Sequence, residues 1–180
     1  PYAFHGRRLI FNNCFNCIKK DEKFGDLLNE IGSEDDELFT KKAYKSNIYK
    51  EFIENKIAPG EKASSSIGNM YSASVFMSLL SMLNVHYDNG SEIKDQKVGF
   101  ISYGSGSKAK IFQGIIQENW KVKIQTSKLF ESLNNRKEIS FEDYQNLHKS
   151  KNIPPLSNHS VRFSHTDKTV NSKGYRRYKI

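Results

Sequence analysis

The chain has 180 residues, 37% of them hydrophobic and 12% aromatic, which is enough apolar material for the core of one domain. Its net charge of +8 arises in the last sixty residues, where 13 lysines and arginines face 5 acids. No segment has the roughly 18 consecutive apolar residues of a membrane span, and two cysteines exclude a disulfide framework.

These features predict a cytoplasmic protein with no membrane partner. The chain opens on Pro1-Tyr2 without an initiator methionine or a signal peptide, which indicates a fragment or a processed piece. The basic C-terminal third could meet nucleic acid, a phosphorylated ligand or an acidic domain, but a solvated lysine-rich surface explains it equally well.

Hydrophobic spacing predicts three helices in the first half of the chain. The first covers about Arg7 to Lys20. The second runs from Glu34 towards Ile57, because Ser33 can cap it and four acids occupy its first turn. We interpret residues 58–66 ("APGEKASSS") as a loop. The third helix covers Tyr71 to His86, and its predicted inner face consists of Val75, Phe76, Leu79, Leu80 and Leu83.

The second half alternates strands with short helices. Residues 97–103 ("KVGFISY") are expected to form a buried strand, 104–107 ("GSGS") a turn, and 108–125 one or two further strands. Short helices follow at Thr126 to Leu133 and at Ser140 to His148, the latter opening on the capping pattern Ser140-x-x-Asp143. After an irregular stretch at 150–160, strands are expected at 161–165 and near the C-terminus. This order predicts one α/β layered domain over residues 1–180.

Three motifs suggest chemistry that simpler interpretations explain. Cys14 and Cys17 form C-x-x-C, but no second pair completes a zinc site, and their helical spacing favours packing as small apolar residues. The five histidines show no metal-ligand spacing, so no metal site is expected. The segment "GYRRY" (174–178) alternates aromatics with arginines as nucleic-acid surfaces do, yet a terminal strand accounts for it.

The segment "YGSGSKA" (103–109) has the G-x-G-x-x-A spacing of a dinucleotide-binding loop. The β-branched residues that follow favour a strand over the required helix, and no acid lies near Ile124 to bind a ribose. A tight turn at Gly104 and Gly106, exposing backbone N–H groups and the Ser105 hydroxyl, is the simpler interpretation.

Two longer stretches together carry a specific resemblance. "GNMYSASVFMSLLSML" (68–83) followed by "VGFISYGSGSKAKIF" (98–112) resembles the C-terminal half of 3-hydroxy-3-methylglutaryl-CoA synthase, a family with G-N-M/I-Y-[ST]-x-S at a helix mouth and S-Y-G-S-G after a strand. "NNRKEISFEDYQNLHK" (134–149) is similar to a late helical region of that family. The resemblance implies half of a thiolase-like αβαβα sandwich.

Two alignments of the N-terminus remain open. The family has a catalytic histidine in F-H-x-P-[FY]. His5 can occupy that position, but Arg7 then replaces the proline. Aligning Pro1-Tyr2 with P-[FY] also matches Gly6, Arg7 and Arg8, and is preferred; the catalytic histidine then precedes residue 1, Phe4 replaces a CoA-contacting lysine, and Arg8 occupies a second basic position.

The resemblance implies condensation of acetyl-CoA with acetoacetyl-CoA in the mevalonate route to isoprenoids. These thioesters are substrates, and no cofactor is implied. Asn69 and Ser105 are implied as catalytic residues, with Asn69 stabilising developing negative charge. The implied substrate-binding residues are Arg8, Tyr71, Tyr103, Gly104 and Gly106.

The family's nucleophilic cysteine and basic glutamate belong to its N-terminal half, so that half is an implied partner, and the full-length enzyme is expected to be a homodimer. Two other hypotheses remain. One is a polyketide β-branching synthase that acts on acyl carrier protein substrates. The other is a non-catalytic basic module that binds nucleic acid, a partner we consider less consistent with the motifs.

Overall fold

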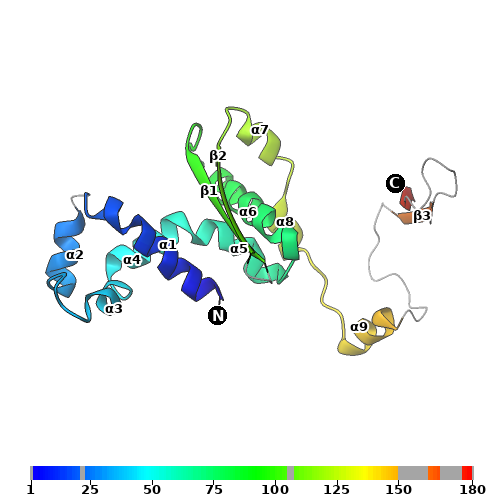
Figure 1. The fold of residues 1–180 in the computed structure, drawn as a ribbon. Coiled ribbons are helices and arrows are strands. Elements are labelled where there is room, and N and C mark those ends of the chain that lie inside the picture. The colour runs from blue at the N-terminus through cyan, green and yellow to red at the C-terminus, as the bar shows by residue number, and fades with distance from the viewer. Residues whose placement is uncertain (1, 21–22, 105–107, 150–161, 167–175, 180) are drawn as a thin grey trace. The chain divides into compact units, whose positions relative to one another are not determined.

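The structure, a computed structural model, describes residues 2–20, 23–104, 108–149, 162–166 and 176–179 (Figure 1). Its contacts divide the chain into two compact units, Pro1–Asn134 and Asn135–Ile180. The single domain expected over residues 1–180 stays a prediction. None of the helices in the described ranges is long and apolar enough to cross a membrane.

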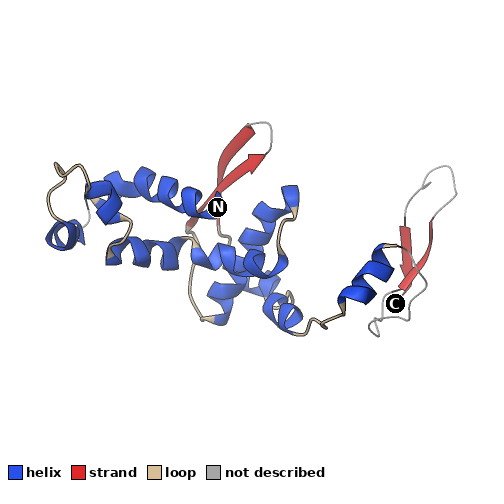
Figure 2. Ribbon diagram, turned by 90° about the horizontal axis from the view of Figure 1, so that it is seen from below, coloured by secondary structure: helices blue, strands red, loops and turns tan. Residues whose placement is uncertain are grey.

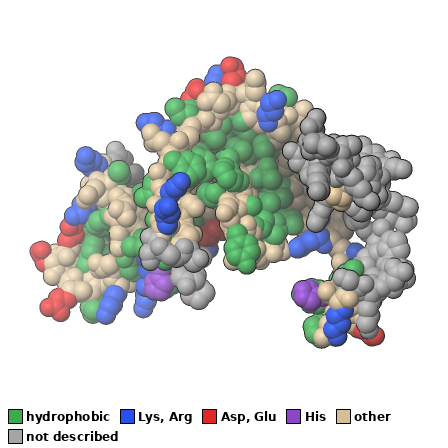
Figure 3. Space-filling view, turned by 45° about the vertical axis from the view of Figure 1, so that its right-hand side comes forward, with side chains coloured by type: hydrophobic (Ala, Val, Ile, Leu, Met, Phe, Trp, Pro, Cys, Tyr) green, Lys and Arg blue, Asp and Glu red, His purple; other side chains and the backbone are tan. Residues whose placement is uncertain are grey.

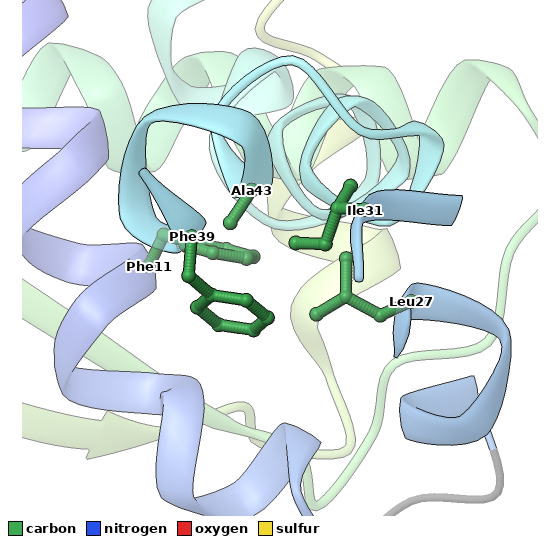
Figure 4. Packing of buried hydrophobic residues seen from close by; sticks show 5 residues of the cluster. All are labelled: Phe11, Leu27, Ile31, Phe39 and Ala43. Atoms are coloured by element: carbon green, nitrogen blue, oxygen red, sulfur yellow. The ribbon is translucent and has the colours of Figure 1, made fainter. Parts of the chain in front are cut away.

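The first four helices enclose one apolar core (Figures 1 and 4). They are α1 (Tyr2–Ile18), α2 (Lys23–Ile31), α3 (Phe39–Ala43) and α4 (Asn47–Lys56). The buried side chains come from α1, α2 and α3, and are Phe11, Leu27, Ile31, Phe39 and Ala43. The predicted first helix is confirmed. Helix α2 was not foreseen, although Leu27 and Ile31 at i and i+4 are a signal for it.

The single helix predicted from Glu34 to Ile57 is wrong, because short polar side chains interrupt it. Asp36 Oδ1 accepts the Leu38 N–H at 2.7 Å, which turns the chain before α3 begins. Ser46, 1% exposed, donates to the carbonyl of Ala43 at 2.7 Å and accepts the Tyr49 N–H at 3.2 Å. The same hydroxyl therefore closes α3 and caps α4.

Residues 58–66, interpreted from sequence as a loop, are helical in the structure. Helix α5 (Ala58–Ile67) has Pro59 in its first turn, where a missing N–H costs no hydrogen bond. It packs against α6 (Ser74–Asp88), which follows the short 3-10 turn η1 (Tyr71–Ala73); these two confirm the predicted third helix. Figure 2 shows these helices beside the two-stranded hairpin.

Helices α5 and α6 approach closely through small residues. A Cβ on Gly60 would lie 3.5 Å from the Ser78 carbonyl oxygen. The fully buried Ser81 hydroxyl accepts the Ala63 N–H at 3.0 Å and donates to the Pro59 carbonyl at 2.7 Å. Phe76, predicted on the inner face of α6, is instead 62% exposed, and the buried residues of this helix are Ser81 and Asn84.

Strands β1 (Lys97–Gly104) and β2 (Lys108–Ile115) form an antiparallel hairpin, which confirms the first predicted strand and the strand after it. Their turn, residues 105–107, lies outside the described residues. The prediction that β1 is a buried strand is wrong, because alternate residues of the strand are exposed. Ile101 pairs with Ile111 on a face where they are 54% and 77% exposed, because no described element covers it. Figure 3 shows hydrophobic side chains gathered on the surface of this unit.

The opposite side of the hairpin packs on a second core. Its buried residues are Ile93, Ile116, Trp120 and Ile124, with Leu80, Met82, Leu83 and Val98 packed against them. The second strand considered for residues 108–125 is wrong, because Trp120 and Ile124 lie one turn apart on α7 (Trp120–Ile124) and both enter this core. Helix α8 (Leu129–Asn134) then confirms the helix expected near Leu133.

Unit Asn135–Ile180 contains α9 (Phe141–His148), β3 (Arg162–Thr166) and β4 (Arg176–Lys179). The Ser140 hydroxyl accepts the Asp143 N–H at 3.0 Å, so the predicted cap of α9 is confirmed. Strands β3 and β4 confirm the two strands expected in this part of the chain, and they pair antiparallel. The irregular stretch predicted at 150–160 lies outside the described residues.

A polar contact at the edge of the second core predicts acid sensitivity. Glu92 accepts from Lys121 Nζ at 2.8 Å, the Lys94 N–H at 3.1 Å and Trp120 Nε1 at 3.3 Å. The Lys121 hydrogen bond first, and then the other two donors, lower the pKa of Glu92 from 4.5 to about 2. Its ionised form therefore favours the folded state.

Because the unfolded chain binds this proton first, the contribution of Glu92 is fully present above its ordinary pKa of 4.5 and is lost as the pH falls through about 2. We expect Glu92→Gln to lower the melting temperature at pH 7 and to converge with the wild type towards pH 2. Glu54→Gln, on the exposed side of α4, is the control. A Glu92→Gln deficit that persists unchanged to pH 2 would contradict the assignment.

Candidate active site

The loop between α5 and η1 has a backbone that only glycine adopts freely. The Gly68 N–H donates to the Ser64 carbonyl at 3.0 Å and closes α5. Gly68 itself has φ +88° and ψ −158°, a region essentially restricted to glycine. The chain therefore turns sharply out of α5 and presents the next residue, Asn69, to solvent.

The Asn69 side chain has a fixed orientation. Its Oδ1 accepts the Tyr71 N–H at 2.7 Å. Because a backbone N–H pairs only with an oxygen, this contact identifies which end of the amide is which. The Nδ2 group then points away from the backbone, and no described residue hydrogen-bonds to it. The exposed loop thus carries an oriented, unused N–H donor.

Tyr71 is strained and exposed. Its φ is +51°, in the left-handed region that is rare for an aromatic residue, and its side chain is 85% exposed. Such a conformation costs about 1–2 kcal/mol without any burial of the ring to offset it. Backbone strain of this kind occurs most often at functional sites.

The second predicted loop is described only up to its edges. Tyr103 lies near the end of β1, is 67% exposed and pairs with Ala109, while Gly104 pairs with Lys108. Ser105 and Gly106 lie outside the described residues. Strand β1 packs against α6, which begins directly after the Asn69 loop. None of the hydrogen bonds or ring contacts among the described residues joins the two loops directly.

Arg8 lies on α1, and its ring contacts are with residues of the first helices and not with either loop. Its guanidinium stacks on the Phe4 ring at 3.9 Å and on the Tyr44 ring at 4.5 Å. Its Nε is buried without a hydrogen-bond partner. The Tyr44 hydroxyl in turn donates to Asn12 Oδ1 at 2.9 Å. Arg8 is therefore held as a planar group between two aromatic rings.

An ion pair that was not predicted from the sequence joins α1 to α5. Arg7 Nε donates to both carboxylate oxygens of Glu61, at 3.1 and 2.9 Å, and this hydrogen bond to Glu61 raises the pKa of Arg7. Glu61 belongs to the first turn of α5, the helix that leads into the Asn69 loop. An arginine and a glutamate 54 residues apart offer no sequence signal for such a pair.

Comparison with solved structures establishes the fold. The chain resembles the structure "MvaS in complex with 3-hydroxy-3-methylglutaryl coenzyme A" with a TM-score of 0.57 and 24% identity, over 85% of this chain and 35% of that one. The predicted α/β class and thiolase-like fold are confirmed.

The family follows from sequence comparison. The family model "Hydroxymethylglutaryl-coenzyme A synthase C terminal" matches residues 6–173, and the chain belongs to this family. Hydroxymethylglutaryl-CoA synthase of Haloferax volcanii is 35% identical over 100 residues, covering 56% of this chain and 22% of that protein. The synthase of Saccharomyces cerevisiae is 30% identical over 159 residues, covering 82% of this chain and 31% of that protein.

A relative with a different named substrate is less similar. Polyketide biosynthesis 3-hydroxy-3-methylglutaryl-ACP synthase PksG of Bacillus subtilis is 26% identical over 117 residues, which cover 65% of this chain and 27% of that protein. The matched part of this chain therefore spans less than a third of the length of each of these relatives.

Proposed function

We propose that this chain is the C-terminal part of a hydroxymethylglutaryl-CoA synthase, an acyltransferase that condenses acetyl-CoA with acetoacetyl-CoA in isoprenoid biosynthesis. The observation that carries the proposal is the oriented Asn69 amide, whose Oδ1 is held by the Tyr71 N–H at 2.7 Å and whose Nδ2 is free to donate. Membership of the synthase family gives this donor its expected reaction.

The reaction needs a donor of this kind. The methyl carbon of an enzyme-bound acetyl thioester loses a proton and attacks the ketone carbon of acetoacetyl-CoA, and the carbonyl electron pair moves to oxygen. A rigid N–H donor aimed at this oxygen stabilises the transition state more than the neutral ketone. Asn69 Nδ2 is the group we assign to that role.

Other predicted site residues fit the same proposal in part. Tyr71 and Tyr103 are exposed beside the two loops, where a substrate thioester can reach them. The sequence motif remains the basis for the substrate contacts proposed at Gly104, Ser105 and Gly106. Arg8 can still donate from the edge of its stacked guanidinium, so its contact with a CoA phosphate stays a prediction.

The cysteines of this chain do not suit nucleophilic attack. Burial raises the pKa of Cys14, whereas a catalytic cysteine needs a depressed pKa to form its thiolate. Cys17 is exposed in the last turn of α1. The proposal therefore places the nucleophile and the base in a further half of the synthase.

The exposed face of the hairpin supports such a partner. Ile101, Tyr103, Ile111 and Ile115 share one face of the strand pair and are each more than half exposed. Within the described ranges, β1 and β2 pair only with each other, so each has an edge available for another strand. We propose that the N-terminal half covers this face; the homodimer and the cytoplasmic address stay predictions.

The carrier-protein alternative has support from the PksG relative. It differs in the substrate and not in the chemistry of Asn69. Nucleic-acid binding has less support, because it leaves the loop geometry without a use.

The proposal predicts two different outcomes for two proteins. The complete synthase that contains this chain is expected to convert acetyl-CoA and acetoacetyl-CoA into 3-hydroxy-3-methylglutaryl-CoA, detected by mass spectrometry. Residues 1–180 alone are expected to give no product, because nucleophile and base are absent. Product from residues 1–180 alone would contradict this assignment, and faster conversion of carrier-bound acetoacetate would favour the alternative.

A further inference from the structure

The peptide group that follows Asn69 is tied to the start of α6. The Met70 N–H donates to the Ser74 hydroxyl at 3.2 Å, and both residues are partly buried. Ser74 is the first residue of α6, whose position against α5 is fixed by the buried Ser81 bridge. The loop is therefore connected to a rigid element by one side-chain hydrogen bond.

This contact constrains the backbone of Asn69 itself. The Met70 nitrogen belongs to the same peptide plane as the Asn69 carbonyl, so holding it limits the rotation ψ of Asn69. The Tyr71 N–H separately holds the side-chain amide through Oδ1 at 2.7 Å. Together the two bonds determine where Asn69 Nδ2 points, one through the backbone and the other through the side chain.

The Ser74 contact runs backwards along the chain, to the N–H of Met70, the residue that precedes η1. A serine that caps a helix accepts an N–H two or three residues further along the chain. Ser74 instead accepts from Met70, four residues earlier, and the preceding N-cap position, Ala73, makes no side-chain cap. The hydrogen bond therefore orders the loop.

We propose that Ser74 is a positioning residue that sets the direction of the Asn69 amide during condensation. The inference rests on the proposed synthase function for its kinetic consequences, but the geometry it asserts is independent of that function. Ser74 touches no reacting atom in this proposal and acts only through Asn69.

The kinetic test uses the complete synthase that contains this chain. Ser74→Ala is expected to lower the condensation rate about tenfold, the equivalent of one neutral hydrogen bond, while acetyl transfer from acetyl-CoA to the enzyme keeps its rate. Ser74→Thr retains the hydroxyl and is expected to restore condensation. Ser72→Ala, at an exposed position of η1, is the matched control.

A double variant separates positioning from general damage. If Ser74 acts through Asn69, Asn69→Ala with Ser74→Ala condenses no more slowly than Asn69→Ala alone. Equal losses in acetyl transfer and condensation, or additive losses in the double variant, would overturn the inference.

A structural readout distinguishes failure of this inference from failure of the proposed function. In a crystal structure of the Ser74→Ala synthase, the Asn69 amide is expected to lose its single orientation, and in Ser74→Thr to keep it. An unchanged Asn69 in Ser74→Ala overturns the inference whatever the enzyme catalyses. Absence of product from the wild type overturns the synthase proposal and the kinetic part, while the crystal structure still decides the geometry.

Discussion

Replacing Asn69 by alanine in the complete synthase is expected to lower the condensation rate by roughly 10²–10³, the usual cost of losing one oxyanion donor. Acetyl transfer to the nucleophile is expected to change much less, because we expect that step to use donors nearer the nucleophile. Single-turnover assays of the two steps measure the difference. Asn55→Ala is the control for the loss of an asparagine, because Asn55 is an exposed residue of α4.

The structure adds a sharper variant. Because Asn69 Oδ1 accepts the Tyr71 N–H, the side chain also orders the turn, and Asn69→Ala is expected to cost about 1 kcal/mol of stability. Asn69→Asp retains that acceptor, but replaces the Nδ2 donor by an oxygen and adds a negative charge. It is therefore expected to melt like the wild type and to condense at least as slowly as Asn69→Ala. Normal condensation by Asn69→Asp would show that the residue serves the turn alone.

Phe11→Ala is expected to give the largest loss of stability, about 3–5 kcal/mol. The Phe11 side chain is 1% exposed and makes edge-on ring contacts with Tyr49 at 5.0 Å and Phe52 at 5.4 Å between centroids. Its removal leaves a cavity in the core that α1, α2 and α3 share (Figure 4).

Leu9→Ala is the matched control for this prediction. Leu9 lies two residues earlier on α1 and is 62% exposed, so its truncation is expected to change the free energy of unfolding by no more than about 0.5 kcal/mol. Urea denaturation followed by circular dichroism measures both variants. Equal losses of unfolding free energy in the two variants would contradict the prediction that the burial of Phe11 stabilises this core.

Local sequence patterns were sufficient to predict the family, the loop at Asn69 and most of the helices and strands. The Ser140 cap, the apolar α6 and the strand ahead of Gly104 all follow from neighbouring residues, and the structure confirms them. The paired motifs around Asn69 and Tyr103 were specific enough to indicate the synthase family.

Features that depend on residues distant in the sequence could not be predicted and became visible only in the folded chain. Residues 58–66 are helical because Gly60 and Ala63 pack on α6, and a run of small residues carries no hydrophobic period that would reveal this. The acids and serines at 33–46 divide one expected helix into two, because their side chains compete for backbone N–H groups. The orientation of the Asn69 amide likewise required coordinates, since it depends on the left-handed backbone at Tyr71, which the sequence does not display.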